Sequence, residues 1–213
     1  KTTGYCEFYG IYLNVGTAVA SSIQNNIIRN FSWVNTNTVD WAAIQVQAGN
    51  VNIGTTSGNT IGAATGTGSI VATFGNQGVV NGIKILSAGT VDCQNNIIGS
   101  ITAANAAPTG FTSFYGIYKS AVAGTTTISN NQIGSTVTAN SIAATCTNIN
   151  AQNQVVYGIY SEGTGTITMN ANTIANISSS NTSTAGLING IKSTAGTNTI
   201  TNNTVRNLTI ANS

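Results

Sequence analysis

The chain has 213 residues, and only 5% of them are charged, against about 25% in an average protein. A hydrophobic content of 41% with a single Pro argues against a disordered chain. Six scattered Lys and Arg residues form no basic stripe, which argues against nucleic-acid binding. No apolar run reaches the ~18 residues of a membrane-spanning helix, so we expect no membrane insertion.

The pentapeptide QNNII occurs twice, at residues 24–28 and 94–98. Its second Asn belongs to a pattern, Asn-x-Ile or Asn-x-Val, that recurs at intervals of 31 to 41 residues. A pattern that returns every thirty-odd residues is typical of solenoid proteins. The six anchor residues, in chain order, are Asn26, Asn59, Asn96, Asn131, Asn172 and Asn203.

A second signature, a small residue followed by Ile, precedes each anchor by a nearly constant interval. The pairs are Gly10-Ile11, Ala43-Ile44, Gly82-Ile83, Gly116-Ile117, Gly158-Ile159 and Gly190-Ile191. The length variation falls after each anchor, at 33–40, 66–79, 103–113, 138–155 and 179–187. Insertions gathered at one corner of every unit are expected of a solenoid, so we expect loops there.

The segments between these points alternate apolar and β-branched polar residues, as in TGTITM at 164–169, and no helical stripe persists. Parallel strands without connecting helices predict an all-β fold, a single-stranded parallel β-helix of about six coils. The general crossover preference favours the right-handed form. We expect one β-helix domain over residues 1–213, as a piece of a longer protein, with further coils or other chains at its open ends.

The anchors have a structural interpretation. Asn tolerates the left-handed conformation that a bend between strands needs, and its amide bonds to local backbone. Stacked once per coil, the six amides can also bond to one another along the axis. We therefore predict an internal asparagine ladder of the six anchors rather than a ligand site.

The three cysteines are Cys6, Cys93 and Cys146, without the spacing of a zinc site. Cys93 occupies a position that Ile or Met fills in other coils, which predicts a buried thiol. The sequence leaves a disulfide between Cys6 and Cys146 as an alternative to free thiols. No motif indicates a metal or another cofactor, and we expect none.

With its NNxI units and its GIY and GIK units, the chain resembles secreted or cell-surface right-handed parallel β-helix repeat proteins of bacteria. The resemblance implies an extracellular or cell-surface location and a modular parent protein. The same fold hosts pectate lyases, polygalacturonases and phage tailspikes, so the fold by itself does not give the function.

Enzymes on this fold that act on polysaccharides need clustered acids, about 5–10 Å apart for hydrolysis. The chain has four acids: Glu7, Asp40, Asp92 and Glu162. No two of them take equivalent positions in neighbouring repeats, and the chain has no His to act as a base. The one pair worth inspection is a loop-borne Asp40 with Glu7. We expect no enzyme, and a polysaccharide lyase or hydrolase stays the second alternative.

The leading expectation is a structural or adhesive segment that holds a glycan or a surface partner through its insertion loops. Aromatic rings stack on sugars, and exposed ones often mark binding sites. The candidates are Trp33, Phe74 and Phe111 at the insertion corner and Tyr12, Tyr118 and Tyr160 directly after the Gly-Ile signature. The competing interpretations are a cover for the core and ordinary surface packing.

The first alternative is an ice-binding solenoid, because coils four to six carry a Thr-x-Thr array on outward positions. Its residues are Thr125, Thr127, Thr166, Thr168, Thr197, Thr199 and Thr201. Coils one to three interrupt the array, with Ile53 and Thr55 in coil two and Asp92 in coil three. A charge within such a face counts against ice binding, and exposed Thr is also common in ordinary strands.

Overall fold

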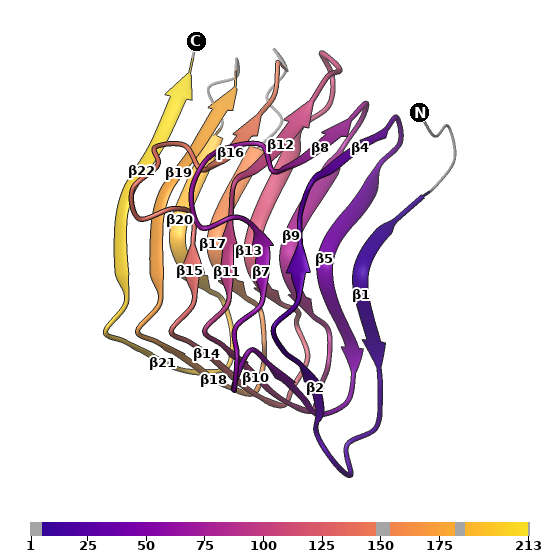
Figure 1. The fold of residues 1–213 in the computed structure, drawn as a ribbon, viewed down its shortest axis with the longest axis vertical. Helices are drawn as coiled ribbons and strands as arrows, with labels where there is room; N and C mark the ends of the chain where they lie inside the picture. The colour runs from indigo at the N-terminus through magenta and orange to yellow at the C-terminus, as the bar shows by residue number, and fades with distance from the viewer. Residues whose placement is uncertain (1–5, 148–153, 182–185, 213) are drawn as a thin grey trace.

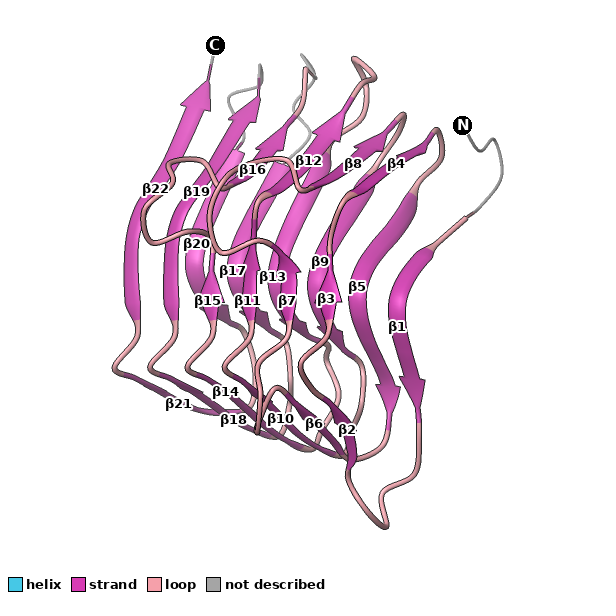
Figure 2. Cartoon of the chain, viewed as in Figure 1, coloured by secondary structure: helices cyan, strands magenta, loops and turns pink. Residues whose placement is uncertain are grey.

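The computed structural model describes residues 6–147, 154–181 and 186–212, which wind into a parallel β-helix of about six coils (Figure 1). The described residues form strands joined by turns and loops, without a helix (Figure 2). All strand pairs are parallel, and each strand pairs with its equivalents in the coils before and after it. The predicted solenoid is therefore confirmed; residues 148–153 and 182–185 of the predicted insertion loops lie outside the described residues.

Three faces surround the core. The tyrosine face consists of β1 (Phe8–Asn14), β5 (Val39–Ala48), β9 (Gly78–Ile85), β13 (Thr112–Lys119), β17 (Gln154–Ser161) and β20 (Gly186–Ser193). The threonine face consists of β2 (Ser21–Ile23), β6 (Val51–Ile53), β10 (Thr90–Gln94), β14 (Thr125–Ser129), β18 (Thr166–Asn170) and β21 (Thr197–Thr201).

The third face has ten strands, because most coils cross it in two short strands. These are β3 (Ile27–Ile28), β4 (Phe31–Asn35), β7 (Thr60–Gly62), β8 (Ile70–Phe74), β11 (Ile97–Gly99), β12 (Ile101–Asn105), β15 (Gln132–Ile133), β16 (Ile142–Thr145), β19 (Thr173–Asn181) and β22 (Thr204–Asn212). The last two strands each span the whole width of the face, since β19 pairs with both β15 and β16.

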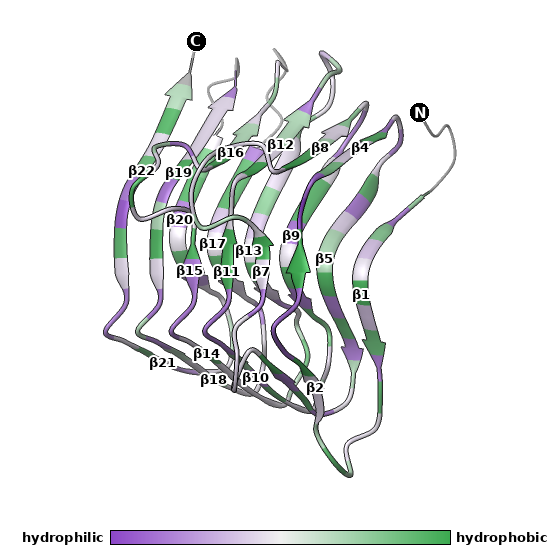
Figure 3. Ribbon diagram, viewed as in Figure 1, coloured by the Kyte–Doolittle hydropathy of each residue, from purple (hydrophilic) through white to green (hydrophobic). Residues whose placement is uncertain are grey.

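The core is built from columns of stacked apolar side chains. The Ile of each small-Ile signature pairs with the Ile of the next coil, and Ile44, Ile83, Ile117 and Ile159 are fully buried. Burial of such a side chain stabilises the fold by about 1.5–3 kcal/mol. Figure 3 shows the resulting alternation of apolar and polar bands along the strands. Cys93 lies in one of these columns between Ile53 and Ile128, as predicted for a buried thiol.

The small residue of the signature is required by close packing between coils. A Cβ added at Gly116 would lie 2.5 Å from the carbonyl oxygen of Gly158, and one added at Gly82 would lie equally close to that of Gly116. Contacts this short do not occur in proteins, so even a methyl side chain at Gly82 or Gly116 would push the coils apart, and only coil two has Ala, Ala43, at this place. The signature thus marks a position where one backbone passes directly beneath the next.

The asparagine ladder is present. The Oδ1 atom of Asn131 accepts hydrogen bonds from the Nδ2 and the backbone N of Asn96, both at 2.9 Å. Its own Nδ2 donates to Oδ1 of Asn172 at 3.0 Å and to the carbonyl of Cys93 at 2.9 Å. The same pattern links all six anchors from Asn26 to Asn203. Every inner amide is therefore satisfied without water, which a buried polar side chain requires.

The left-handed conformation expected at the anchors belongs instead to the residue before them, which corrects the prediction. Positive φ angles occur at Asn25, Asn95, Asn130 and Asn202, and Ala171 takes the same place in coil five. In each QNNII segment the two Asn residues therefore have different roles. The first, Asn25 or Asn95, adopts the left-handed conformation of the turn, and the second, Asn26 or Asn96, belongs to the ladder.

Coil two departs from the predicted register. Ile53 pairs with Cys93 and points into the core, and Asn52 takes the outward place beside Asp92. The expectation that Ile53 faces outward was therefore wrong. The added length lies in residues 54–58 before the anchor, where the side chain of Gln24 binds Thr55 and two backbone amides.

The last residue of β13, Lys119, points into the core and is fully buried. Its Nζ donates to the carbonyl oxygen of Ser87 at 2.7 Å, and no carboxylate contacts it among the described residues. Desolvation lowers the pKa of Lys119 to about 8, because the charged form loses its hydration inside the solenoid. An ammonium without a counter-charge in this place destabilises the fold at neutral pH.

We predict that an Asn131→Ala variant loses about 2–4 kcal/mol of the free energy of unfolding, since buried donors of Asn96 and acceptors of its neighbours lose their partners. Asn203→Ala, at the solvent-accessible end of the ladder, is the matched control and should lose less. Urea unfolding measures both. Equal losses at the two positions would contradict the role of the buried ladder.

We predict that Lys119→Met stabilises the chain at pH 7 by about 2 kcal/mol, because the penalty of a depressed pKa is fully present below pH 8. Between pH 8 and 9.5 the unfolded chain holds the Lys119 proton more tightly than the folded one. The free energy of unfolding of the wild type should therefore rise over that range relative to that of the variant, in which the titration of buried Cys93 is the same. A difference between the two proteins that stays constant over the same range would contradict the buried, desolvated ammonium.

Candidate functional site

The tyrosine face carries its outward side chains in columns that run along the solenoid. One column, two residues before each signature Ile, reads Tyr9, Ala42, Asn81, Tyr115, Tyr157 and Asn189. A second, one residue after it, reads Tyr12, Gln45, Lys84, Tyr118, Tyr160 and Lys192. In a regular strand, residues three apart point to opposite faces. Here the closely packed small residue between the two columns interrupts the alternation, so both columns face outward.

A hollow of about 420 Å³ opens on this face where the side chains of the first column become small. Ala42 and Asn81 separate the ring of Tyr9 in coil one from that of Tyr115 in coil four. The residues that line the hollow are Asp40, Val79, Asn81, Lys84, Leu86, Tyr115, Tyr118, Tyr160 and Glu162. Its walls combine phenol rings with charged groups of both signs.

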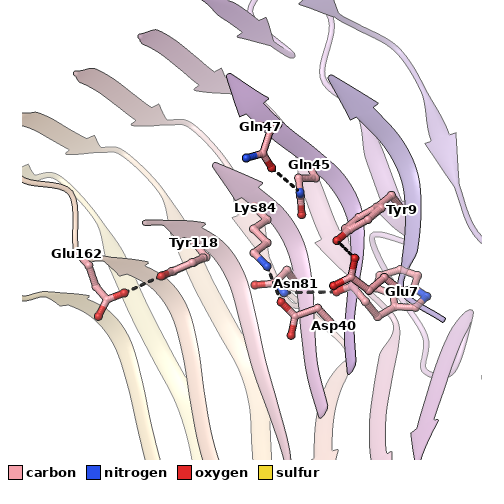
Figure 4. Close-up of polar contacts among 10 residues, drawn as sticks. Glu7, Tyr9, Asp40, Gln45, Gln47, Asn81, Lys84, Tyr118 and Glu162 are labelled. Atoms are coloured by element: carbon pink, nitrogen blue, oxygen red, sulfur yellow. Dashed lines mark hydrogen bonds and ion pairs between the residues drawn. The ribbon is translucent and has the colours of Figure 1, made fainter. Parts of the chain in front are cut away.

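One wall of the hollow is an ion pair. Lys84 on β9 donates to the carboxylate of Asp40 on β5, as Figure 4 shows. Both side chains are partly buried, with exposed fractions of 14% and 33%. The sequence placed Asp40 in a loop beside Glu7; the structure places it on a strand, bound to Lys84. Glu7 accepts a hydrogen bond from Tyr9 at 2.6 Å and does not line the hollow.

The opposite wall is built around Glu162. Its two carboxylate oxygens accept hydrogen bonds from the hydroxyls of Tyr118 and Tyr160, each at 2.6 Å. These bonds hold the pKa of Glu162 below its ordinary value. Burial, with the neighbouring carboxylate, raises the pKa of Tyr160 to about 12 and that of Tyr118 further. Glu162 therefore stays charged, and both phenols stay neutral, across the physiological range.

The rings form one continuous aromatic cluster over coils four and five. Tyr115 stacks on Tyr157 with centroids 5.3 Å apart, and Tyr118 stacks on Tyr160 at 5.5 Å. The ammonium of Lys192 from coil six lies 5.0 Å from the centroid of Tyr157 and 5.2 Å from that of Tyr160. The cluster thus accepts a cation on its far side, as phenol rings do through their electron-rich faces.

Two buried side-chain amides, those of Asn81 and Gln45, lie near the hollow. The oxygen of each, Oδ1 of Asn81 and Oε1 of Gln45, accepts no hydrogen bond from the described residues. Asn81 is 1% exposed and Gln45 is 3% exposed. Their amide nitrogens are bound, to the carbonyl of Trp41 and to Gln47 respectively. Figure 4 shows both amides beside the ion pair of Lys84 and Asp40. An unpaired buried acceptor of this kind is costly and calls for a donor.

A smaller hollow of about 90 Å³ adjoins the first and shares Asp40 and Val79 with it. It is lined in addition by Thr38, Val39, Gln77, Gly78 and Phe111. Phe111 is half-buried at its edge. Of the three aromatic residues expected at the insertion corner, Phe111 therefore lies next to the tyrosine face.

The other two aromatic candidates serve the core. Phe74 on β8 is fully buried, so its ring cannot meet a ligand, which corrects the prediction. Trp33 on β4 packs edge-on against Phe74 at 5.2 Å and covers the apolar interior at the first coil. Tyr12 is 48% exposed but lies three coils from Tyr118, outside the hollow. Of the predicted tyrosines, Tyr118 and Tyr160 line it.

The threonine face has the predicted register in its last three coils. Thr166 pairs with Thr125 on one side and Thr197 on the other, and Thr168 pairs in the same way with Thr127 and Thr199. The next outward row reads Ser129, Asn170 and Thr201. Asp92 of coil three lies beside Thr127 and ends that row, whereas Thr90 lies beside Thr125 and continues the other row.

The sequence missed Asn81, Lys84, Tyr115 and Glu162 as parts of one site. Strict alternation from Tyr118 places Tyr115 on the opposite side of the strand, and only the packing at Gly116 reverses this. The signal that could have united them is the alignment of the six signatures, which puts Lys84 and Asn81 one coil before the two tyrosines. No disulfide joins Cys6 to Cys146.

We predict that Glu162→Gln lowers the pH at which Tyr118 and Tyr160 ionise, because it removes the negative charge and the anionic acceptor that hold them protonated. Their ionisation should stay above that of free tyrosine, since burial is the larger cause. Phenolate absorbance in a pH titration measures this. Asp92→Asn, which removes a charge from the threonine face, is the control and should change nothing; an unchanged titration of Glu162→Gln would contradict the arrangement.

Comparison with protein-family models, with curated proteins and with solved structures finds no match in any of the three. Within the part of the chain that the structure describes, no helix has the length and apolar character needed to cross a membrane. The functional argument therefore depends on the geometry of the tyrosine face.

Proposed function

We propose that the chain is a non-catalytic structural and adhesive segment of an extracellular or cell-surface protein, which binds a glycan on its tyrosine face. The observation that carries the proposal is the hollow of about 420 Å³ lined by Tyr115, Tyr118 and Tyr160 together with Asp40, Lys84 and Glu162. Phenol rings offer flat apolar area to the faces of sugar rings, and charged groups at their edges bind hydroxyls.

The shape of the solenoid also suits a chain-like ligand. The columns run along the axis with a repeat of ~4.8 Å, so the rings over coils four and five and the amides over coils two and three present successive contacts in a line. The smaller hollow continues this surface past Asp40 to Phe111. The insertion corner, where a partner was first expected, would then form one end of the glycan surface.

The carboxylates favour binding over hydrolysis. The backbones that carry Asp40 and Glu162 are about three coil steps, ~14 Å, apart along the axis. Both carboxylates are engaged, that of Asp40 by Lys84 and that of Glu162 by two tyrosine hydroxyls. The hydroxyl bonds hold the pKa of Glu162 below its ordinary value, whereas the general acid of a glycoside hydrolase needs a raised pKa. Glu7 and Asp40 are neighbours, but each is engaged, by Tyr9 and by Lys84, and only Asp40 faces the hollow.

The location outside the cell rests on the pattern of the repeats. The NNxI and GIK units are similar to those of secreted bacterial β-helix repeat proteins.

Ice binding is the second candidate, favoured by the in-register rows of threonines in coils four to six. The row through Thr127 extends over three coils only and ends at Asp92, and the row through Thr125 reaches one coil further, to Thr90. A thermal-hysteresis assay separates the two functions: ice binding through the threonine face gives hysteresis that Thr168→Tyr abolishes, and a glycan-binding segment gives none.

We predict that Tyr118→Ala weakens binding to the best ligand of an oligosaccharide array by about tenfold or more, because it removes a stacking ring and one partner of Glu162. Tyr118→Phe, which keeps the ring, should retain most of the affinity. Thr168→Ala on the threonine face is the matched control. Titration calorimetry measures all three. If no oligosaccharide binds, or if Tyr118→Ala binds as well as the control, the proposed function is wrong.

A further inference from the structure

The hollow of the tyrosine face offers mostly hydrogen-bond acceptors, with the hydroxyl of Tyr115 as a neutral donor. The described groups in and beside it are the carboxylates of Asp40 and Glu162, the amide oxygens of Asn81 and Gln45, and the phenol oxygens. The hydroxyls of Tyr118 and Tyr160 already donate to Glu162, so they present their lone pairs. The one cationic donor that lines it, Lys84, is committed to Asp40. A complementary ligand must therefore bring donors of its own.

The charged groups that line the hollow also favour a ligand that carries hydrogen-bond donors. The lining contains two carboxylates and one ammonium, and both carboxylates lie next to aromatic rings or apolar side chains that reduce their hydration. Glu162 stays ionised because two phenols donate to it. A ligand with acidic groups would meet like charge here, and a cationic ligand would meet opposite charge.

The aromatic cluster already holds a cation in an equivalent setting. Lys192 places its ammonium over Tyr157 and Tyr160 and donates to the hydroxyl of Tyr157 at 3.1 Å. On the other side of the same cluster, Tyr115 and Tyr118 line the hollow. The neighbour of Tyr115 in the first column is Asn81, whose side chain is shorter than that of tyrosine. An ammonium carried by a ligand could lie against these rings as Lys192 lies against their partners.

The unpaired oxygen of Asn81 is the independent sign that a donor is missing. Asn81 is 1% exposed, its nitrogen is fixed by the carbonyl of Trp41, and Oδ1 accepts no hydrogen bond from the described residues. A buried acceptor without a partner destabilises the fold, so a ligand donor that reaches it is favoured. Lys84 lies beside Asn81 (Figure 4), and both residues line the hollow.

We propose that the hollow recognises the protonated amino group of an amino-sugar chain, with Asp40 as its anionic partner, Asn81 as a further acceptor and Tyr115 and Tyr118 as stacking surfaces. In this account the ligand ammonium replaces Lys84 at Asp40. The inference rests on the proposed glycan-binding function and adds the class of glycan. Neutral glycans keep the stacking but lose the ion pair, and acidic glycans are repelled.

The test compares short chitosan oligosaccharides, which carry free amines, with their N-acetylated counterparts at mildly acidic pH, by titration calorimetry. We expect the charged form to bind about tenfold more tightly, a preference that added salt reduces. Asp40→Asn should remove that preference and leave binding of the acetylated form unchanged. Lys84→Met should strengthen chitosan binding several-fold, because it frees Asp40.

Asp92→Asn is the matched control, since it removes the same charge from the threonine face. Equal binding of the two oligosaccharides, or a loss for Asp40→Asn no greater than for the control, would overturn the amino-sugar inference. If neutral oligosaccharides then still bind and Tyr118→Ala abolishes this, the proposed function stands without it. If neither chitosan nor any neutral or acidic oligosaccharide binds, both proposals fail. Circular dichroism of each variant checks that it has folded.

Discussion

The asparagine ladder is the constraint on which the rest of the molecule depends. Each inner amide accepts two hydrogen bonds from the coil before it and donates to the coil after it. A one-residue slip of any coil would leave several buried donors unpaired, so every coil must place its corner in the same position. The columns of Ile in the core and the columns of polar residues on the faces then follow from that one alignment.

Because the coils are held in register, substitutions along a column have local and predictable consequences. Ala42 and Asn81 lie between Tyr9 and Tyr115 in the first column, and a hollow appears where these two rings are missing. The residues that vary between coils, and not the residues that repeat, therefore shape the hollow. The repeated residues explain why the surface is rigid enough to have a defined shape.

Much of the fold could be predicted from the sequence because the Asn anchor and the small-Ile signature each occur six times at regular spacing. The Asn anchors, the small-Ile signature and the threonine rows of coils four to six all lie where their spacing placed them. The errors arose where local backbone departs from alternation. Three added residues before Asn59 shifted coil two, and the break in strand alternation at the closely packed Gly116 put Tyr115 on the same side as Tyr118. Glu162 and Asp40 could not be assigned to one site, since their proximity to the tyrosines depends on side-chain packing across coils.

The proposed binding in the hollow of the tyrosine face can be measured directly by NMR of ring-labelled protein as an oligosaccharide is added, because the chain has seven tyrosines. We expect the ring signals of Tyr115, Tyr118 and Tyr160 to shift together and saturably, and those of Tyr9 and Tyr12 in coil one to move little. Shifts confined to threonine methyl signals, with every tyrosine unchanged, would contradict the proposed binding.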